Sequence, residues 1–249
     1  MKSFINSYSY KCLLGPQSKN AKIIGNLACW TVGKKHHFTN IALFDQNDIG
    51  YLKAFGPANF HYLSEDNMLL LKQSFKVQRI KLNSCCIEMD KLLYVGRKYH
   101  NIRGAINKNK RLNLTIQDNY NKIEDVKEML SEWSNVIAQK YFRDFSGKNY
   151  FFYKNNFHIG CNNIFVYDQD KLIAFASLSP GEYSSYIIGK ALFNRYVGLS
   201  EFADDLAYQK AILNGTKIVN LGQSKGNIAS YKDKFPGSFN IIHYDGNIE

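Results

Sequence analysis

The residues best placed to do chemistry lie in one stretch, "NLGQSKGNIASYKDKF" (220–235). A short apolar run ends at Asn220, and glycines follow it, the first at Gly222. Glycine lacks a Cβ, so the backbone there can approach a ligand closely. Tyr231 and Lys232 add a hydroxyl group and a positive charge. The pattern indicates an anion-binding turn at the end of a strand.

The same stretch has a plainer interpretation, which the sequence leaves open. An ordinary surface loop would leave its lysines solvated and place Tyr231 and Phe235 in the core. Asn220 also suits a turn, because its side chain accepts hydrogen bonds from the nearby backbone. The two interpretations differ in Lys232, whose charge would point inward toward a ligand only in the first.

The composition narrows the class of protein. The chain has 249 residues, a formal net charge of +11 and five cysteines, none of them in a CxxC spacing. This cysteine pattern predicts reduced thiols and neither a disulfide framework nor a metal site. The excess of Lys and Arg favours polyanionic partners such as nucleic acid, an anionic membrane surface or a phosphorylated cofactor. No HExxH motif, Walker loop or dinucleotide fingerprint is present, which argues against metalloproteases, NTPases and dehydrogenases.

The first ninety residues read as short strands separated by turns. Apolar runs at 27–32 and 38–44 flank the basic segment "GKKHH", which predicts a hairpin with His36 and His37 in its turn. Residues 63–75 are predicted to form a helix with Ser64 as its N-cap. Alternation over 76–84 predicts a strand.

A basic segment follows at 96–111, with six Lys or Arg residues and no acid. Ile102 and Ile106 lie four residues apart, so a helix here has a narrow apolar stripe. A linker helix of this charge suits the backbone of RNA, although a solvated linker explains it as well. The candidate RNA-binding residues are Arg97, Lys98, Arg103, Lys108, Lys110 and Arg111.

The second half has a definite order of elements. Apolar steps of three and four predict an amphipathic helix over 122–142. A hairpin over 163–179, a strand over 185–193 and a helix over 199–215 follow, and the last ends at a Gly that suits a C-cap. Two more strands, over 217–221 and 239–244, flank the opening stretch. The order predicts an α/β (α+β) fold with helices packed on sheets.

This order resembles the acyltransferase fold of the GNAT superfamily. In that superfamily an [Arg/Gln]-x-x-Gly-x-[Gly/Ala] loop follows the fourth strand and opens a helix. Here "RYVGLS" (195–200) stands in that place, with Ser in the last position. Backbone N–H groups at such a helix N-terminus bind a pyrophosphate. The resemblance therefore implies substrate binding by Arg195, Val197, Gly198 and Ser200.

A second resemblance covers residues 90–240. "LYVGRKYHNIRGAINKNKRLNLTI" resembles a segment of the C-terminal domain of lysyl-phosphatidylglycerol synthases and their stand-alone relatives. The matching positions are Gly96, Lys98, Tyr99, Arg103, Ile106 and Asn107. "NLG" followed by "YKDKF" is similar to a signature that this family shares with the Fem-type aminoacyltransferases.

These resemblances imply a tandem GNAT-like fold. We expect two mixed or antiparallel sheets flanked by helices and joined by a basic helix. Residues 1–95 would form a degenerate N-terminal half, 96–118 a basic linker helix and strand, and 119–249 the catalytic half.

The resemblances also imply an acyltransferase in which an amine or hydroxyl attacks the activated carbonyl directly. Tyr231 is then the candidate for proton transfer to the leaving group, and Lys232 for facing a phosphate or carboxylate. Backbone N–H groups near Leu192–Phe193 would polarise the carbonyl. Asp204 and Asp205 are expected to be exposed in the first turn of a helix, with pairing to a substrate amine as the alternative. Further candidate substrate-binding residues are Asn220, Gly222, Ser224 and Lys234.

The sequence does not decide which donor and which acceptor the protein uses. The basic linker and the Fem-type resemblance favour aminoacyl-tRNA, with acyl-CoA or an acyl carrier protein as the alternative and no tightly bound cofactor. The acceptor would be a small molecule, a peptide or a lipid. A catalytically inactive module that binds nucleic acid or an anionic membrane is the competing hypothesis. We expect a cytoplasmic protein, with peripheral membrane attachment left open.

Overall fold

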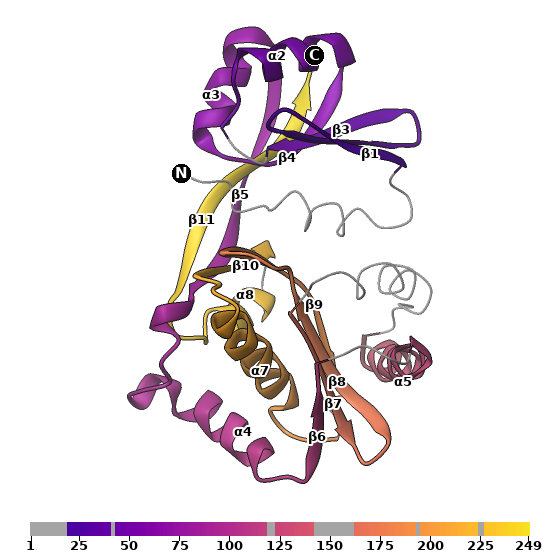
Figure 1. The fold of residues 1–249 in the computed structure, drawn as a ribbon, viewed down its shortest axis with the longest axis vertical. Helices are drawn as coiled ribbons and strands as arrows, with labels where there is room; N and C mark the ends of the chain where they lie inside the picture. Colours follow the sequence, from indigo (N-terminus) through magenta and orange to yellow (C-terminus); the bar gives the residue numbers. More distant parts are fainter. Residues whose placement is uncertain (1–18, 41–42, 119–122, 142–161, 193–194, 224–226) are drawn as a thin grey trace.

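The structure is a computed structural model, and it describes residues 19–40, 43–118, 123–141, 162–192, 195–223 and 227–249. Within these ranges the strands form one sheet, in the order β1-β2-β3-β4-β11-β5-β10-β9-β8-β7-β6. Both parallel and antiparallel pairs occur, and helices pack on the sheet (Figure 1). The predicted α+β fold class is therefore confirmed, and the two expected sheets are joined edge to edge in this single sheet.

The first part of the chain builds one end of this sheet. Its strands are β1 (Lys19–Ile24), β2 (Leu27–Val32), β3 (Lys35–Asn40) and β4 (Ala58–Leu63). Its helices are α2 (Gln46–Phe55) and α3 (Glu65–Ser74). The side chain of Ser64 accepts a hydrogen bond from the N–H of Asn67, so the predicted N-cap of α3 is confirmed.

The predicted hairpin is also confirmed, but its turn is shorter than expected. β2 and β3 pair antiparallel, and His36 and His37 lie inside β3 opposite Thr31 and Trp30. The expectation that both histidines lie in the turn is wrong. Gly33, with a φ of 61°, makes the turn earlier, since glycine adopts this left-handed conformation without strain.

The second part builds the rest of the sheet. Its strands are β5 (Val77–Glu88), β6 (Leu114–Gln117), β7 (Asn162–Asp168), β8 (Lys171–Leu178), β9 (Tyr183–Ala191), β10 (Ile218–Gln223) and β11 (Ser238–Ile248). Its helices are α4 (His100–Lys110), α5 (Ile123–Tyr141), α7 (Leu199–Leu213) and α8 (Asn227–Lys232), with short 3-10 helices η2 (Met89–Lys91) and η3 (Arg97–Tyr99). The three long helices predicted in this part are confirmed. None of the described helices is long and apolar enough to cross a bilayer.

The helices of the second part cover both faces of its sheet. Figure 1 shows α7 on one face of β7, β8 and β9 and α5 on the other. The stripe that predicted α5 points inward, because Val126 and Leu130 are buried. Ile102 and Ile106 of α4 are buried in the same way, and this helix packs on α7.

Two hydrophobic cores result, and β5 reaches both, with Cys85 and Ile87 in one and Val77 packed against the other. One core gathers residues between Cys85 and Phe235, and the other lies under α2 and α3. Tyr244 and Ile248, near the end of the chain, pack in the second of these cores. The last strand therefore completes the first half of the molecule, whereas the domain boundaries at residues 95 and 119 stay a prediction.

A hydrogen-bonded chain fixes β11 to β4. Asp245 accepts from the backbone N–H of Tyr62 at 2.9 Å and lies 3.3 Å from Nδ1 of His61. His61 in turn lies 3.0 Å from the ring of His37 on β3. Burial raises the pKa of the Asp245 carboxyl, but the hydrogen bonds from His61 and Tyr62 outweigh it, and the pKa is lowered.

We predict that Asp245→Asn lowers the free energy of unfolding by about 1–3 kcal/mol at neutral pH. A carboxyl whose pKa is lowered by folding contributes stability above its ordinary pKa of 3.8, and this is lost as the pH falls through the folded value. The difference between wild type and variant should therefore shrink below a pH of about 4. Urea unfolding at neutral and acid pH measures this, with the exposed Asp90→Asn as the control. An equal difference at both pH values would contradict the assignment.

Candidate functional site

β10 ends in a tight turn that its own side chains build. Asn220 is buried, and its Oδ1 accepts a hydrogen bond from the N–H of Gly222 at 2.7 Å. Gly222 has a φ of 74°, and a Cβ placed on it would meet none of the described residues within 4 Å. Asn220 therefore acts as the turn residue, and Gly222 leaves open space beside the backbone. Ser224 lies outside the described residues.

Lys232 folds back on this turn. Its ammonium group donates to the carbonyl oxygens of Leu221 at 2.5 Å and of Gly222 at 3.1 Å. Burial lowers the pKa of Lys232, and the nearby thiols of Cys85 and Cys86 oppose this effect. The interpretation of Lys232 as a solvated loop lysine is therefore wrong, because its charge points inward at the end of β10.

Tyr231 reaches a buried carboxylate. Its hydroxyl group donates to Oδ2 of Asp204 at 2.8 Å. Asp204 and Asp205 are 4% and 2% exposed, so the expectation that they lie exposed on α7 is wrong. They lie instead on the inner face of α7, near Tyr94 and Tyr208, whose pKa values burial and these carboxylates raise.

The charges around Asp205 are partly balanced. Burial raises the pKa of Asp205, while Tyr94, Lys110 and Gln209 oppose this effect. The ammonium group of Lys110 lies 3.9 Å from Oδ2 of Asp205. One of the candidate RNA-binding lysines therefore also faces the buried acids.

Lys234 joins the end of the stretch to the first turn of α7. It forms an ion pair with Glu201 at 2.6 Å and lies 4.4 Å from the centroid of the Tyr231 ring. Phe235 is buried and packs edge-on against Tyr208. The structure thus brings the segment 231–235 beside the start of α7, the helix that "RYVGLS" opens.

The "RYVGLS" loop is held by α4. Gly198, with a φ of 78°, is the N-cap of α7, and no side chain caps this helix end within the described ranges. A Cβ on Gly198 would collide with the Cβ of Ala105 on α4. Asn109 donates from Nδ2 to the carbonyl oxygens of Ala105 and Val197, both at 2.9 Å.

The other loop residues face outward to different degrees. Val197 is 73% exposed, Ser200 is half-buried, and Arg195 lies 3.8 Å from Glu132 of α5. Leu192 was expected to offer a backbone N–H to the substrate carbonyl, but this N–H donates to Ile173 at 2.8 Å. For Leu192 the expectation is wrong, because its N–H is already bonded to β8, and Phe193 lies outside the described residues.

Most of the basic residues of the linker are exposed. Arg103 is the exception, since its guanidinium group donates to the carbonyl oxygens of Tyr94 at 2.5 Å and Gly96 at 3.4 Å. Its first role is therefore to hold the chain that enters α4. The exposed members of the candidate RNA-binding set are Arg97, Lys98, Lys108, Lys110 and Arg111.

Sequence reasoning missed two contributors to this region. Asn109 lies in a run of basic residues, and nothing in the pattern marks it as buried. Asp204 was noticed, but its position was misjudged, because a carboxylate in the first turns of a helix is usually exposed. The spacing of Asp204 from Tyr208, one helical turn, was the available signal that both lie on the core side.

Comparison with known proteins gives structural likeness alone. No family model and no curated protein matches the sequence. The C-terminal domain of a putative lysylphosphatidylglycerol synthetase from Agrobacterium fabrum has a TM-score of 0.68 at 15% identity, over 99% of this chain and 88% of that one. The structure of FemX has a TM-score of 0.60 at 11% identity, over 97% and 96% of the two chains. A GCN5-related N-acetyltransferase from Kribbella flavida has a TM-score of 0.51 at 13% identity, over 99% and 95%.

The fold is therefore GNAT-like, of the type seen in lysyl-phosphatidylglycerol synthase domains and in FemX. This confirms the resemblance that the sequence motifs indicated. At 15% identity or less, the likeness concerns the fold.

We predict that Gly198→Ala lowers the free energy of unfolding by about 2–4 kcal/mol, because the new Cβ adds overpacking to backbone strain. Gly215→Ala at the other end of α7 is the matched control, since Gly215 has a φ of 81° and a Cβ there would meet none of the described residues within 4 Å. It should cost only the strain, about 1–2 kcal/mol. Thermal and urea unfolding of both variants measure the difference. Equal losses of unfolding free energy in the two variants would show that α4 does not restrict the side chain at position 198.

Proposed function

We propose that the chain is an acyltransferase that moves an aminoacyl group from aminoacyl-tRNA to an amine or hydroxyl acceptor. The fold supports transfer chemistry, because solved structures of the same shape are described as an aminoacyl-lipid synthetase domain, FemX and an acetyltransferase. The net charge of +11 supports a polyanionic donor.

One observation carries the proposal: the basic helix is docked directly on the "RYVGLS" loop. Asn109 and Ala105 of α4 contact Val197 and Gly198, while Lys108 and Lys110 of α4 stay exposed. An RNA strand that follows these charges would lie next to the start of α7. The same end of α7 contacts Tyr231 and Lys234, so a polyanion site and the candidate chemistry are adjacent.

The proposed reaction needs no covalent enzyme intermediate. The acceptor nitrogen or oxygen forms a bond to the ester carbonyl carbon, and the bond between this carbon and the terminal ribose oxygen breaks. The acceptor loses one proton, and the ribose oxygen gains one. We assign the donation of this proton to Tyr231, which Asp204 holds in place through its hydroxyl group.

Lys232 would supply the positive charge of the site. Its ammonium group is fixed at the end of β10 by two carbonyl oxygens, so it needs little reorganisation when negative charge develops. Its partial burial strengthens the interaction with a phosphate or an oxyanion, because fewer waters screen it. The open space beside Gly222 is where such a group would approach.

The donor is tested with the purified full chain, charged tRNA and acyl-CoA, with transfer to added amines as the readout. We predict transfer from charged tRNA and a steep fall of tRNA affinity with salt, with a log–log slope of about −0.7 per single-strand phosphate contacted. Changing Lys108 of α4 and its exposed neighbours Arg97, Lys98 and Arg111 to Gln (the α4 variant) should flatten this slope. The matched control neutralises four exposed lysines outside the basic segment 96–111, which are Lys53, Lys72, Lys76 and Lys81.

Two outcomes would contradict the proposal. Transfer from acyl-CoA alone would replace the tRNA donor by a thioester. Equal salt slopes for the α4 variant and its control would show that α4 is not the RNA-binding surface. Salt-sensitive binding without transfer from any donor would instead favour the inactive binding module.

A further inference from the structure

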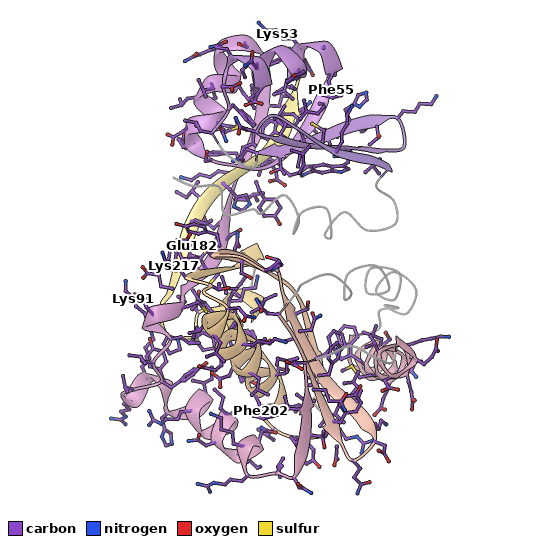
Figure 2. All side chains as sticks on the ribbon, viewed as in Figure 1. Lys53, Phe55, Lys91, Glu182, Phe202 and Lys217 are labelled. Carbon is purple, nitrogen blue, oxygen red and sulfur yellow. The ribbon has the colours of Figure 1, made fainter. Side chains whose placement is uncertain are left out.

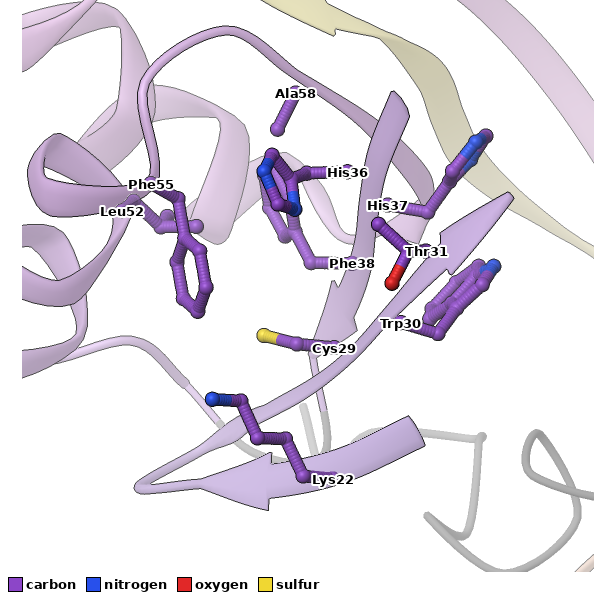
Figure 3. A pocket seen from close by; sticks show the side chains of 10 residues that line it. All are labelled: Lys22, Cys29, Trp30, Thr31, His36, His37, Phe38, Leu52, Phe55 and Ala58. Carbon is purple, nitrogen blue, oxygen red and sulfur yellow. The ribbon is translucent and has the colours of Figure 1, made fainter. Parts of the chain in front are cut away.

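A cavity lies in the first part of the molecule, where α2 covers the strands β1, β2 and β3 (Figure 3). Its volume is about 150 Å³. The transferase proposal makes no use of it, because the hydrogen-bond partners described above for Tyr231 and Lys232 lie on α7 and β10. The side chains used below come from three strands and one helix, so packing of distant segments forms the cavity.

The floor of the cavity is apolar. Phe38 and Leu52 are each 1% exposed, and Cys29 is 6% exposed. Burial raises the pKa of the Cys29 thiol to about 11, while Lys22 lowers it and Asp48 raises it further. Cys29 is therefore a neutral thiol at physiological pH and acts as a small apolar group.

The rim of the cavity is aromatic and cationic. The rings of His36 and Phe55 lie 5.6 Å apart and are tilted by 48°. The ammonium group of Lys22 lies 5.5 Å from the centroid of the Phe55 ring. Figure 3 shows this side chain reaching from β1 toward the space between Cys29 and Phe55. Lys22 forms no ion pair with any residue in the described part of the chain.

The two walls are fixed relative to each other. Asp48 of α2 accepts hydrogen bonds from the backbone N–H and the side-chain amide of Asn26, both at 2.9 Å. Its second role is to close a capping box with Asp45 at the start of α2. A Cβ on Gly25 would collide with the Asp48 carboxylate, so the turn between β1 and β2 needs glycine there. These contacts fix α2 relative to the turn between β1 and β2, and so they maintain the cavity between them.

We propose that this cavity binds a small carboxylate that carries one six-membered aromatic ring. A cavity of about 150 Å³ is known to hold a molecule of the size of benzene. His36 and Phe55 offer the tilted aromatic contacts that such a ring prefers. Lys22 pairs with the carboxylate at the rim, where the ligand keeps its charge in water and its ring in the apolar floor.

The test uses benzoate and its neutral analogue benzamide with the full chain, measured by ligand-observed NMR titration. Because benzoate is small, we expect a Kd of about 1 mM. Lys22→Ala should weaken benzoate about threefold to fivefold, as for one exposed ion pair, and leave benzamide unchanged. Lys53→Ala is the control, because Lys53 is an exposed cation of α2 that does not line the cavity.

A second measurement locates the ligand. Benzoate at about ten times its Kd should slow the alkylation of Cys29 by iodoacetamide about tenfold, read by peptide mass spectrometry. The buried Cys85, which lies in the other core, should be unaffected. Unprotected Cys29 under saturating benzoate would overturn the proposal. Equal binding of benzoate by wild type and Lys22→Ala would overturn the role of the charge, and tighter binding of 1-naphthoate at Cys29 would overturn the size limit.

Discussion

The antiparallel pairing of β5 with β11 is the constraint on which the rest of the structure depends. The two strands pair from Ile87 opposite Ser238 to Val77 opposite Ile248. β11 also pairs with β4, and β5 also pairs with β10, so this ribbon joins the two ends of the sheet. Figure 2 shows the side chains of the first part gathered around the upper end of this ribbon and those of the second part around its lower end.

Gly246 of β11 allows this strand to pack closely between β5 and β4. A Cβ on Gly246 would collide with the backbone oxygen of Gln78 on β5 and with the ring of Phe60 on β4. Only glycine allows β11 to approach both strands here. β10 pairs with the other edge of β5, so the position of the turn that holds Lys232 also depends on this ribbon.

The candidate site combines inward charges of both signs. Lys232 is held by carbonyl oxygens at the end of β10, while Asp204 and Asp205 are buried in α7. Buried charges are costly unless hydrogen bonds or opposite charges compensate them, and here Tyr231 and Lys110 take part in that compensation. Such an arrangement is typical of functional sites, where charge is placed before a ligand arrives.

Local signals allowed much of the fold to be predicted. The stripe of α5, the Ser64 cap of α3 and the end of α7 depend on neighbouring residues, and the structure has all three. The helix α2 was missed, because Gly50 interrupts its pattern, although Asp45 and Asp48 form a capping box.

The tertiary features were not predictable from spacing. The sequence marked α4 and the "RYVGLS" loop separately, but the contact of Ala105 with Gly198 joins positions far apart in the chain. The burial of Asp204 depends on which face of α7 meets the sheet and on where Tyr231 arrives. The inward direction of Lys232 likewise depends on where the carbonyl oxygens of Leu221 and Gly222 lie relative to α8.

Single-turnover transfer from charged tRNA by Lys232→Met tests the central claim most directly. Lys217→Met is the control, because Lys217 is an exposed lysine that pairs with Glu182 near the start of β10. We predict that Lys232→Met lowers the transfer rate at least about a hundredfold while tRNA affinity and the circular dichroism spectrum stay unchanged. Transfer at the wild-type rate by a folded Lys232→Met protein would contradict the claim that the end of β10 is where the acyl group is transferred.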